Sequence, residues 1–231
     1  MKYFEKCNTD ELAERKYNHL LVGMIVLFLV GPLYLRTGLK FPLVMFIFFT
    51  ILQLALKATI GNKRQLLLYR LITLAALVFV FSSQHVSASL SDVLYAIGRS
   101  IYIIFLVIAI HVFMGRIIVA ERITADKVKG GICLYFLAGV VWGFLYEVVY
   151  RFDPAAFQIE TAQSLSFLYY SYSTLTSLGI GDITPSNDFA ISLTCLETIA
   201  GQMFLAVFIA RLVGLHIVQK RRQTGTEKDN E

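Results

Sequence analysis

The chain has 231 residues, of which 57% are hydrophobic and only 16% are charged, and its formal net charge is +5. This composition excludes an ordinary soluble domain and indicates a membrane protein, because the apolar residues fall in long blocks separated by short charged clusters. The basic residues lie at the ends of these blocks and not on one polar face, which argues against nucleic-acid binding. Cys7, Cys133 and Cys195 stand too far apart for a paired metal site or a disulfide scaffold.

We predict that six apolar blocks cross the bilayer as helices, which gives an all-α membrane protein. The predicted spans are 20–35, 41–60, 66–81, 93–120, 130–150 and 189–218. The segments before, between and after these spans alternate between rich and poor in Lys and Arg, and the first and last are rich. By the positive-inside rule both termini then lie in the cytoplasm, and the connection between the fifth and sixth spans lies outside.

The fifth span carries two glycines four residues apart, Gly139 and Gly143. This spacing predicts that another helix approaches closely, although small residues are common in membrane helices in general. In the connection that follows, residues 162–176 have apolar and aromatic side chains at helical spacing but are too few to cross a bilayer. We therefore predict a re-entrant half-helix, whose negative C-terminal end favours a cation beyond it.

The stretch after this half-helix predicts an ion-coordinating filter. Gly179 and Gly181 permit backbone angles that other residues avoid, so that successive carbonyls can point to the same side of the chain. Hydroxyl side chains precede these glycines, and Asp182 follows them. The alternative is a plain turn, because a Gly-x-Gly-Asp run close to Pro185 is usually a turn in a soluble protein.

The order of outer helix, half-helix, filter and inner helix over 130–218 resembles the pore of the potassium-channel family. The signature of that family, Thr-Val-Gly-Tyr-Gly-Asp, corresponds here to Ser-Leu-Gly-Ile-Gly-Asp at 177–182. The resemblance implies that potassium is the permeant ion and that no cofactor is needed. The implied filter residues are Ser177, Leu178, Gly179, Ile180 and Gly181. The implied potassium ligands are the backbone carbonyls of Ser177, Leu178, Gly179 and Ile180, together with the Ser177 hydroxyl. The implied filter support comes from Tyr169, Tyr170, Thr176 and Asp182.

The predicted inner helix has Gly201 where the family has a hinge glycine, and bending there is the expected gate. The expected gate or cavity residues are Gly201, Gln202, Leu205, Ile209 and Val213. For the last four, ordinary helix packing is the alternative. One chain supplies only one filter strand, so a closed ring of four identical subunits is expected.

The resulting hypothesis is a passive, homotetrameric potassium channel of the plasma membrane. Residues 1–19 form a cytoplasmic N-terminal segment, 20–120 a four-helix transmembrane scaffold, 128–218 the pore domain and 219–231 a cytoplasmic tail. This tail is too short for a ligand-binding domain, so any ligand control must come from a separate regulatory chain or from the first four spans. Its basic residues are expected to anchor it at the membrane, with contact to anionic lipid as the alternative.

Two departures from the family signature keep a weakly selective monovalent cation channel as an alternative. Ser177 lacks the methyl group of threonine, and Ile180 replaces an aromatic residue that braces the filter in the family. An ion-coupled transporter is the alternative from another class. It should show an internal repeat with broken helices in both halves, whereas this sequence has one glycine-interrupted segment.

Two acids lie inside predicted spans, Glu147 and Glu197, and we expect them to make structural hydrogen bonds around the outer half of the pore. No His, Cys or Ser lies at a useful spacing from either acid in its own span, so an enzyme is not expected. In the fourth span Arg99 is followed next by Arg116. This spacing lacks the regular arginine series that a voltage sensor needs.

Overall fold

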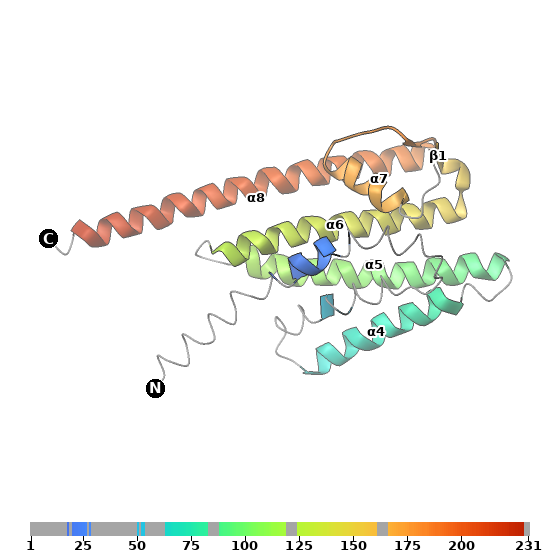
Figure 1. Ribbon diagram of the computed structural model, residues 1–231, viewed down its shortest axis with the longest axis horizontal. Helices are drawn as coiled ribbons and strands as arrows, with labels where there is room; N and C mark the ends of the chain where they lie inside the picture. The colour runs from blue at the N-terminus through green and yellow to red at the C-terminus, as the bar shows by residue number, and fades with distance from the viewer. Residues whose placement is uncertain are drawn as a thin grey trace.

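The computed structural model (Figure 1) describes the chain over residues 18, 20–26, 28, 50, 52–53, 63–82, 88–118, 124–160 and 166–228. Nearly all of the predicted N-terminal segment, half of the predicted span 20–35 and most of the predicted span 41–60 lie outside the described residues.

Four long helices make up most of the described chain and run alternately in opposite directions (Figure 1). They are α4 (Lys63–Ser82), α5 (Ala88–Ile118), α6 (Ala125–Phe152) and α8 (Asp188–Lys228). Within the described ranges, three stretches are helical, long and apolar enough to cross a membrane. These are Leu90–Gly115, Ala125–Phe152 and Asp188–Ile217. They correspond to the fourth, fifth and sixth predicted spans, whereas the apolar part of α4 is shorter (Leu67–Phe79).

Helix α5 lies between α4 and α6 and supplies the centre of the main hydrophobic core (Figure 1). Tyr102, Phe105 and Leu106 on α5 are almost completely buried. They belong to one cluster with Leu134 and Leu137 of α6, which are buried as well. The large side chains of α5 therefore hold α6 on a packed base.

The short helix α7 (Ser166–Leu175) lies against the other face of α6. At ten residues it is about 15 Å long, roughly half the thickness of a hydrocarbon core. A Cβ atom added to Gly139 would lie 2.3 Å from the Tyr172 ring, and one added to Gly143 would lie 3.2 Å from the Leu168 Cα. The predicted close approach at these two glycines is confirmed, and the approaching helix is α7.

The prediction of an all-α fold was wrong in one respect, because the protein is mostly helical with one small sheet. Strands β1 (Phe157–Ile159) and β2 (Ile183–Pro185) pair antiparallel, with Phe157 opposite Pro185 and Ile159 opposite Ile183. A short 3-10 helix, η2 (Pro154–Ala156), leads from α6 into β1. Three-residue strands are too short to give an alternating pattern, so the sequence carried no signal for them.

Candidate functional site

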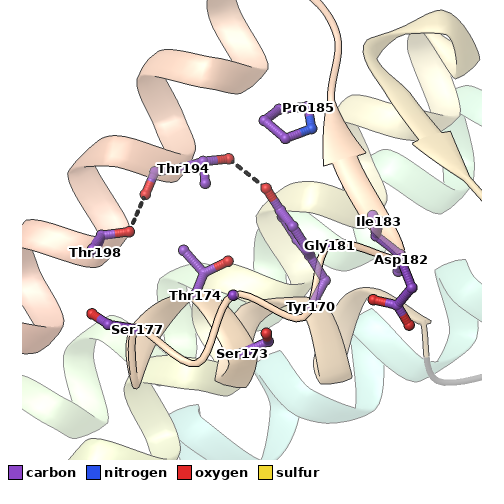
Figure 2. Close-up of a pocket in the computed structure, with 11 residues that line it drawn as sticks. Tyr170, Ser173, Thr174, Ser177, Gly181, Asp182, Ile183, Pro185, Thr194 and Thr198 are labelled. Atoms are coloured by element: carbon purple, nitrogen blue, oxygen red, sulfur yellow. Dashed lines mark hydrogen bonds between the residues drawn. The ribbon is translucent and has the colours of Figure 1, made fainter.

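The predicted filter lies in residues 176–182, here called the filter segment, between the end of α7 and strand β2. The segment passes beside α8 (Figure 2). Three of its residues have positive φ: Ser177 at 58°, Gly179 at 58° and Gly181 at 89°. Two are the glycines singled out in the sequence, which adopt such angles without strain. Ser177 is a non-glycine residue in the same region of φ, which is uncommon.

The amide hydrogens in the first part of the filter segment, up to Ile180, point back to α7. The amide nitrogens of Leu178 and Gly179 lie 2.8 and 3.2 Å from the Ser173 carbonyl oxygen. The Ile180 nitrogen lies 3.3 Å from the Ser173 hydroxyl. In a planar trans peptide unit, the carbonyl of one residue points opposite to the N–H of the next. The carbonyls of Ser177, Leu178 and Gly179 therefore point away from α7, as a row.

These three carbonyl oxygens accept no hydrogen bond from any group in the described part of the chain. Backbone carbonyls are strong acceptors, and one without a protein partner must be satisfied by water or by a cation. The filter segment thus presents three adjacent, unused oxygen ligands on the side opposite to α7.

One side chain of α8 reaches the filter segment. Gln202 donates a hydrogen bond from Nε2 to the Ser177 hydroxyl over 2.8 Å. The sequence had placed Gln202 only in a cavity wall or gate. Its contact with Ser177 joins the start of the filter segment to α8 just after Gly201.

At Gly201, α8 comes very close to the end of α7. A Cβ atom added there would lie 2.3 Å from the Leu175 carbonyl oxygen. The same oxygen accepts a hydrogen bond of 2.8 Å from the Tyr135 hydroxyl of α6. Helix α8 runs through Gly201 without interruption. Glycine is therefore required here for a close backbone contact, independently of any hinge.

The remaining residues expected in the gate or cavity lie further along α8. Ile209 and Val213 are more than half exposed in the single chain, and Leu205 is partly buried. None of the three contributes to the buried cores of the described chain. The structure thus leaves this part of α8 facing outwards.

The residues expected to support the filter are spread over three surroundings. The Tyr169 hydroxyl lies near Asp182, and its pKa is raised by loss of surrounding water and by the Asp182 carboxylate. Tyr170 is buried in an aromatic cluster, where its ring centroid lies 4.9 Å from that of Tyr146, and its hydroxyl is 2.7 Å from the Thr194 hydroxyl of α8. Thr176 donates to the Tyr172 carbonyl over 2.6 Å and so caps the end of α7.

A hollow of about 360 Å³ opens between the filter segment, α7 and α8 (Figure 2). Most of its polar lining consists of hydroxyl groups, and Asp182 adds a carboxylate at the β2 end. The residues that line it are Tyr170, Ser173, Thr174, Ser177, Gly179, Gly181, Asp182, Ile183, Pro185, Thr194 and Thr198. The hollow reaches the side of the filter segment on which Ser173 lies.

The two acids inside the apolar helices both make structural contacts, as expected. Glu147 forms an ion pair of 2.6 Å with Arg99 of α5 and accepts a hydrogen bond of 2.8 Å from Tyr95. Glu197 is completely buried and has hydrogen-bond partners on α6 and α7, Tyr146 and Ser171. Glu147 thus joins α6 to α5, whereas Glu197 joins α8 to the helix that carries the filter segment.

Sequence analysis missed Ser173 and Ser171 as the residues that hold the filter segment and α7 in place. In the sequence, Ser173 stood out only as one of the hydroxyl residues before Gly179 and Gly181, yet its carbonyl and hydroxyl oxygens accept hydrogen bonds from three backbone amides of the filter segment. Ser171 carries no motif. The only signal that could have led to Ser171 was the buried acid itself, since an acid in an apolar span needs a partner on a neighbouring helix.

Residues 131–216 match a family model described as an ion channel. The match includes most of α6, then α7, the filter segment and most of α8. No curated protein and no solved structure matches the chain.

Proposed function

We propose, from the premise that residues 131–216 belong to an ion-channel family, that this chain is one subunit of a homotetrameric channel selective for potassium. The match of residues 131–216 to an ion-channel family and the long apolar helices of the chain support a membrane protein that conducts ions passively and catalyses no reaction. The proposal adds six spans per subunit, a re-entrant α7, and both termini on the cytoplasmic side of the plasma membrane. The alternation of basic connections in the sequence supports this orientation.

The observation that carries the proposal is the direction of the filter carbonyls. Those of Ser177, Leu178 and Gly179 point away from α7 and have no partner in the described chain. With the Ile180 carbonyl and the Ser177 hydroxyl, they form the ligand set that the potassium-channel signature implies. Stacked carbonyl oxygens can replace the hydration shell of potassium as it passes.

A single row of carbonyls covers only one side of an ion, so the site is incomplete in one chain. Helix α8 supports assembly with further copies, because only 6% of its most apolar stretch is buried within the chain. Leu178 and Ile180 are also 66% and 56% exposed. A ring of four copies around the carbonyl row would surround the ion and would cover part of this apolar surface.

The structure also gives a reason to keep a weakly selective cation channel as the second candidate. The bracing aromatic at position 180 is replaced by Ile180, whose side chain is more than half exposed. Tyr170, which could have braced it, is instead packed with Tyr146 and bonded to Thr194. A filter held less firmly at this level would discriminate less between sodium and potassium.

Potassium flux into liposomes that contain the purified full chain tests the filter assignment. Gly179→Ala should lower the flux at least about tenfold, because Gly179 has a φ of 58°, where a side chain strains the backbone. Gly214→Ala is the matched control: the added methyl group meets no atom within 4 Å, and the φ is not positive. Equal flux for Gly179→Ala and the wild type would refute the assignment.

Two further measurements separate the finer parts of the proposal. Reversal potentials in unequal sodium and potassium should lie near the potassium equilibrium potential, and a value near zero would favour the weakly selective channel. The mass of the protein in a mild detergent should correspond to four chains. A stable conducting dimer or monomer would contradict the tetramer.

A further inference from the structure

Glu197 occupies a position that conduction through the carbonyl row does not by itself explain. It lies on α8, it is 0% exposed, and it is among the largest fully buried side chains of the described chain. It lies on the side of α8 that meets α6 and α7, since its partners come from these two helices. An acid in such a place is costly to keep and therefore calls for a role.

The contacts around Glu197 limit which of the hydrogen-bonded oxygens can carry a proton. Tyr146 donates from its hydroxyl to Glu197 Oε2 over 2.5 Å. The Ser171 hydroxyl oxygen lies 2.5 Å from Glu197 Oε1 and 2.8 Å from the Gly139 carbonyl oxygen. A serine hydroxyl has one proton, and a carbonyl oxygen can only accept. If Ser171 donates to Gly139, the proton between Ser171 and Glu197 has to come from the carboxyl group of Glu197.

The charges around Glu197 also favour a protonated carboxyl group. Within the described residues, no Lys, Arg or His forms an ion pair with Glu197. The titratable groups that face it are phenols, which carry no positive charge: Tyr135 and Tyr146 from α6, and Tyr170 and Tyr172 from α7. On α8 itself, Cys195 and the hydroxyl of Thr194 are its near neighbours in sequence. A buried carboxylate without a cation is strongly disfavoured, whereas a neutral carboxylic acid is not.

We propose that Glu197 is a protonated carboxylic acid that donates a hydrogen bond to Ser171 and thereby acts as a positioning residue for the filter segment. The chain of bonds runs from Tyr146 through Glu197 and Ser171 to the Gly139 carbonyl. It ties α8 and α7 to α6 at one point. This role rests on the proposed function, because the filter segment is the part whose position matters for conduction.

The link from Glu197 to the filter segment is short. Ser171 lies two residues before Ser173, on the same ten-residue helix, and Ser173 holds the amides of Leu178, Gly179 and Ile180. A shift of α7 at Ser171 would therefore move the acceptors that orient the carbonyl row. The neutral acid gives one donor and one acceptor in fixed directions, which a carboxylate with two acceptors does not.

Infrared spectroscopy of the purified full chain at pH 7 tests the protonation directly. The wild type should show the carbonyl band of a protonated carboxylic acid, and Glu197→Gln should lose it. Ser171→Ala should keep the band but shift it, because the acid loses its hydrogen-bond acceptor. Asp92→Asn is the control, since Asp92 is a partly exposed acid that is ion-paired with Arg151; its replacement should leave the band unchanged.

Each infrared outcome decides the proposal without reference to conduction. Absence of the band in the wild type would overturn it, as would a band that survives in Glu197→Gln or does not move in Ser171→Ala. The wild-type spectrum and Ser171→Ala suffice if Glu197→Gln fails to fold. If the chain proved not to conduct potassium, these spectra would be unaffected, so a failure of the proposed function is distinguishable from a failure of this inference.

Selectivity in liposomes tests the positioning role. Glutamine supplies the same donor and acceptor as a neutral acid, so Glu197→Gln should keep the potassium-to-sodium permeability ratio within about twofold of the wild type. Ser171→Ala and Glu197→Ala should change that ratio by about fivefold, the effect of losing one hydrogen bond. A change in Glu197→Gln as large as that in Glu197→Ala would mean that the negative charge matters, and would overturn the proposal.

Discussion

Helices α6 and α8 are both apolar enough to cross a membrane, but they are buried very differently. Within its most apolar stretch, α6 is 50% buried in the single chain, and α8 only 6%. Helix α6 is enclosed by α5 on one face and by α7 on the other, whereas α8 touches the rest of the chain mainly near its first half. Composition alone marks both as membrane helices. The difference teaches that α6 is held by its own chain, and that α8 must be covered by lipid or by other copies.

The largest loss of stability is expected when the ion pair that joins α6 to α5 is removed. Arg99→Gln should destabilise the folded chain by about 4 kcal/mol, because it leaves the Glu147 carboxylate without its cation in a largely buried place. Arg99 also lies over the Phe144 ring at 4.3 Å, and that contact is lost as well. Unfolding by denaturant in detergent measures the change. A loss below about 1 kcal/mol would show that the pair is solvated in the folded chain.

Two leucine substitutions, one on α6 and one on α8, test the difference in burial directly. Leu137→Ala on α6 removes a side chain that is 0% exposed, and it should cost about 3 kcal/mol. Leu196→Ala on α8 removes one that is 57% exposed, and in dissociated chains it should cost less than about 0.5 kcal/mol. The same unfolding measurement applies to both. Equal losses in the dissociated state would contradict the difference in burial.

The close backbone contact between α8 and the end of α7 gives the next largest effect. Gly201→Ala should cost about 2 kcal/mol, because the new methyl group would lie 2.3 Å from the Leu175 carbonyl oxygen and force the two helices apart. Gly214→Ala, on the open part of the same helix, should instead be neutral or stabilising. Thermal unfolding of the two variants side by side checks this. Identical behaviour would mean that α8 does not press on α7 at Gly201.

Only a small effect is expected from the ion pair at the exposed end of the α5 and α6 contact. Arg151 forms an ion pair of 2.5 Å with Asp92, but both side chains are about two-fifths exposed. Arg151→Ala should therefore cost only about 0.5 kcal/mol, and less at high salt. Stability measured at two salt concentrations tests this. A salt-independent loss of several kcal/mol would place this pair with the Arg99 pair.

Much of the fold was predictable, because long apolar blocks have few alternatives to membrane helices. Helices α5, α6 and α8 correspond to predicted spans, and the spacing of Gly139 and Gly143 correctly predicted a close helix contact. The β1 and β2 pair was not predictable. Its residues are separated by the whole of α7 and the filter segment, and neither strand is long enough to show a pattern of its own.

The candidate site was predictable where the backbone itself carries the signal. Gly179 and Gly181 predicted backbone angles that other residues avoid, and both residues have positive φ. Side-chain partners were harder to foresee, because the bond from Gln202 to Ser177 spans 25 residues and that from Tyr146 to Glu197 spans 51. A single sequence gives the type of residue at such positions but not the neighbour that folding brings to it. The positive φ of Ser177 could not be predicted from the sequence either, because serine does not favour positive φ angles.

The length of α8 has a mechanical consequence. Its 41 residues form one continuous helix of about 62 Å, about twice the thickness of a hydrocarbon core. If Asp188–Ile217 crosses the bilayer, the residues of α8 that follow extend beyond it as a continuation of the same helix. A force applied to this end of α8, by a lipid headgroup or another protein, would be transmitted along the helix to the contact between Gly201 and Leu175.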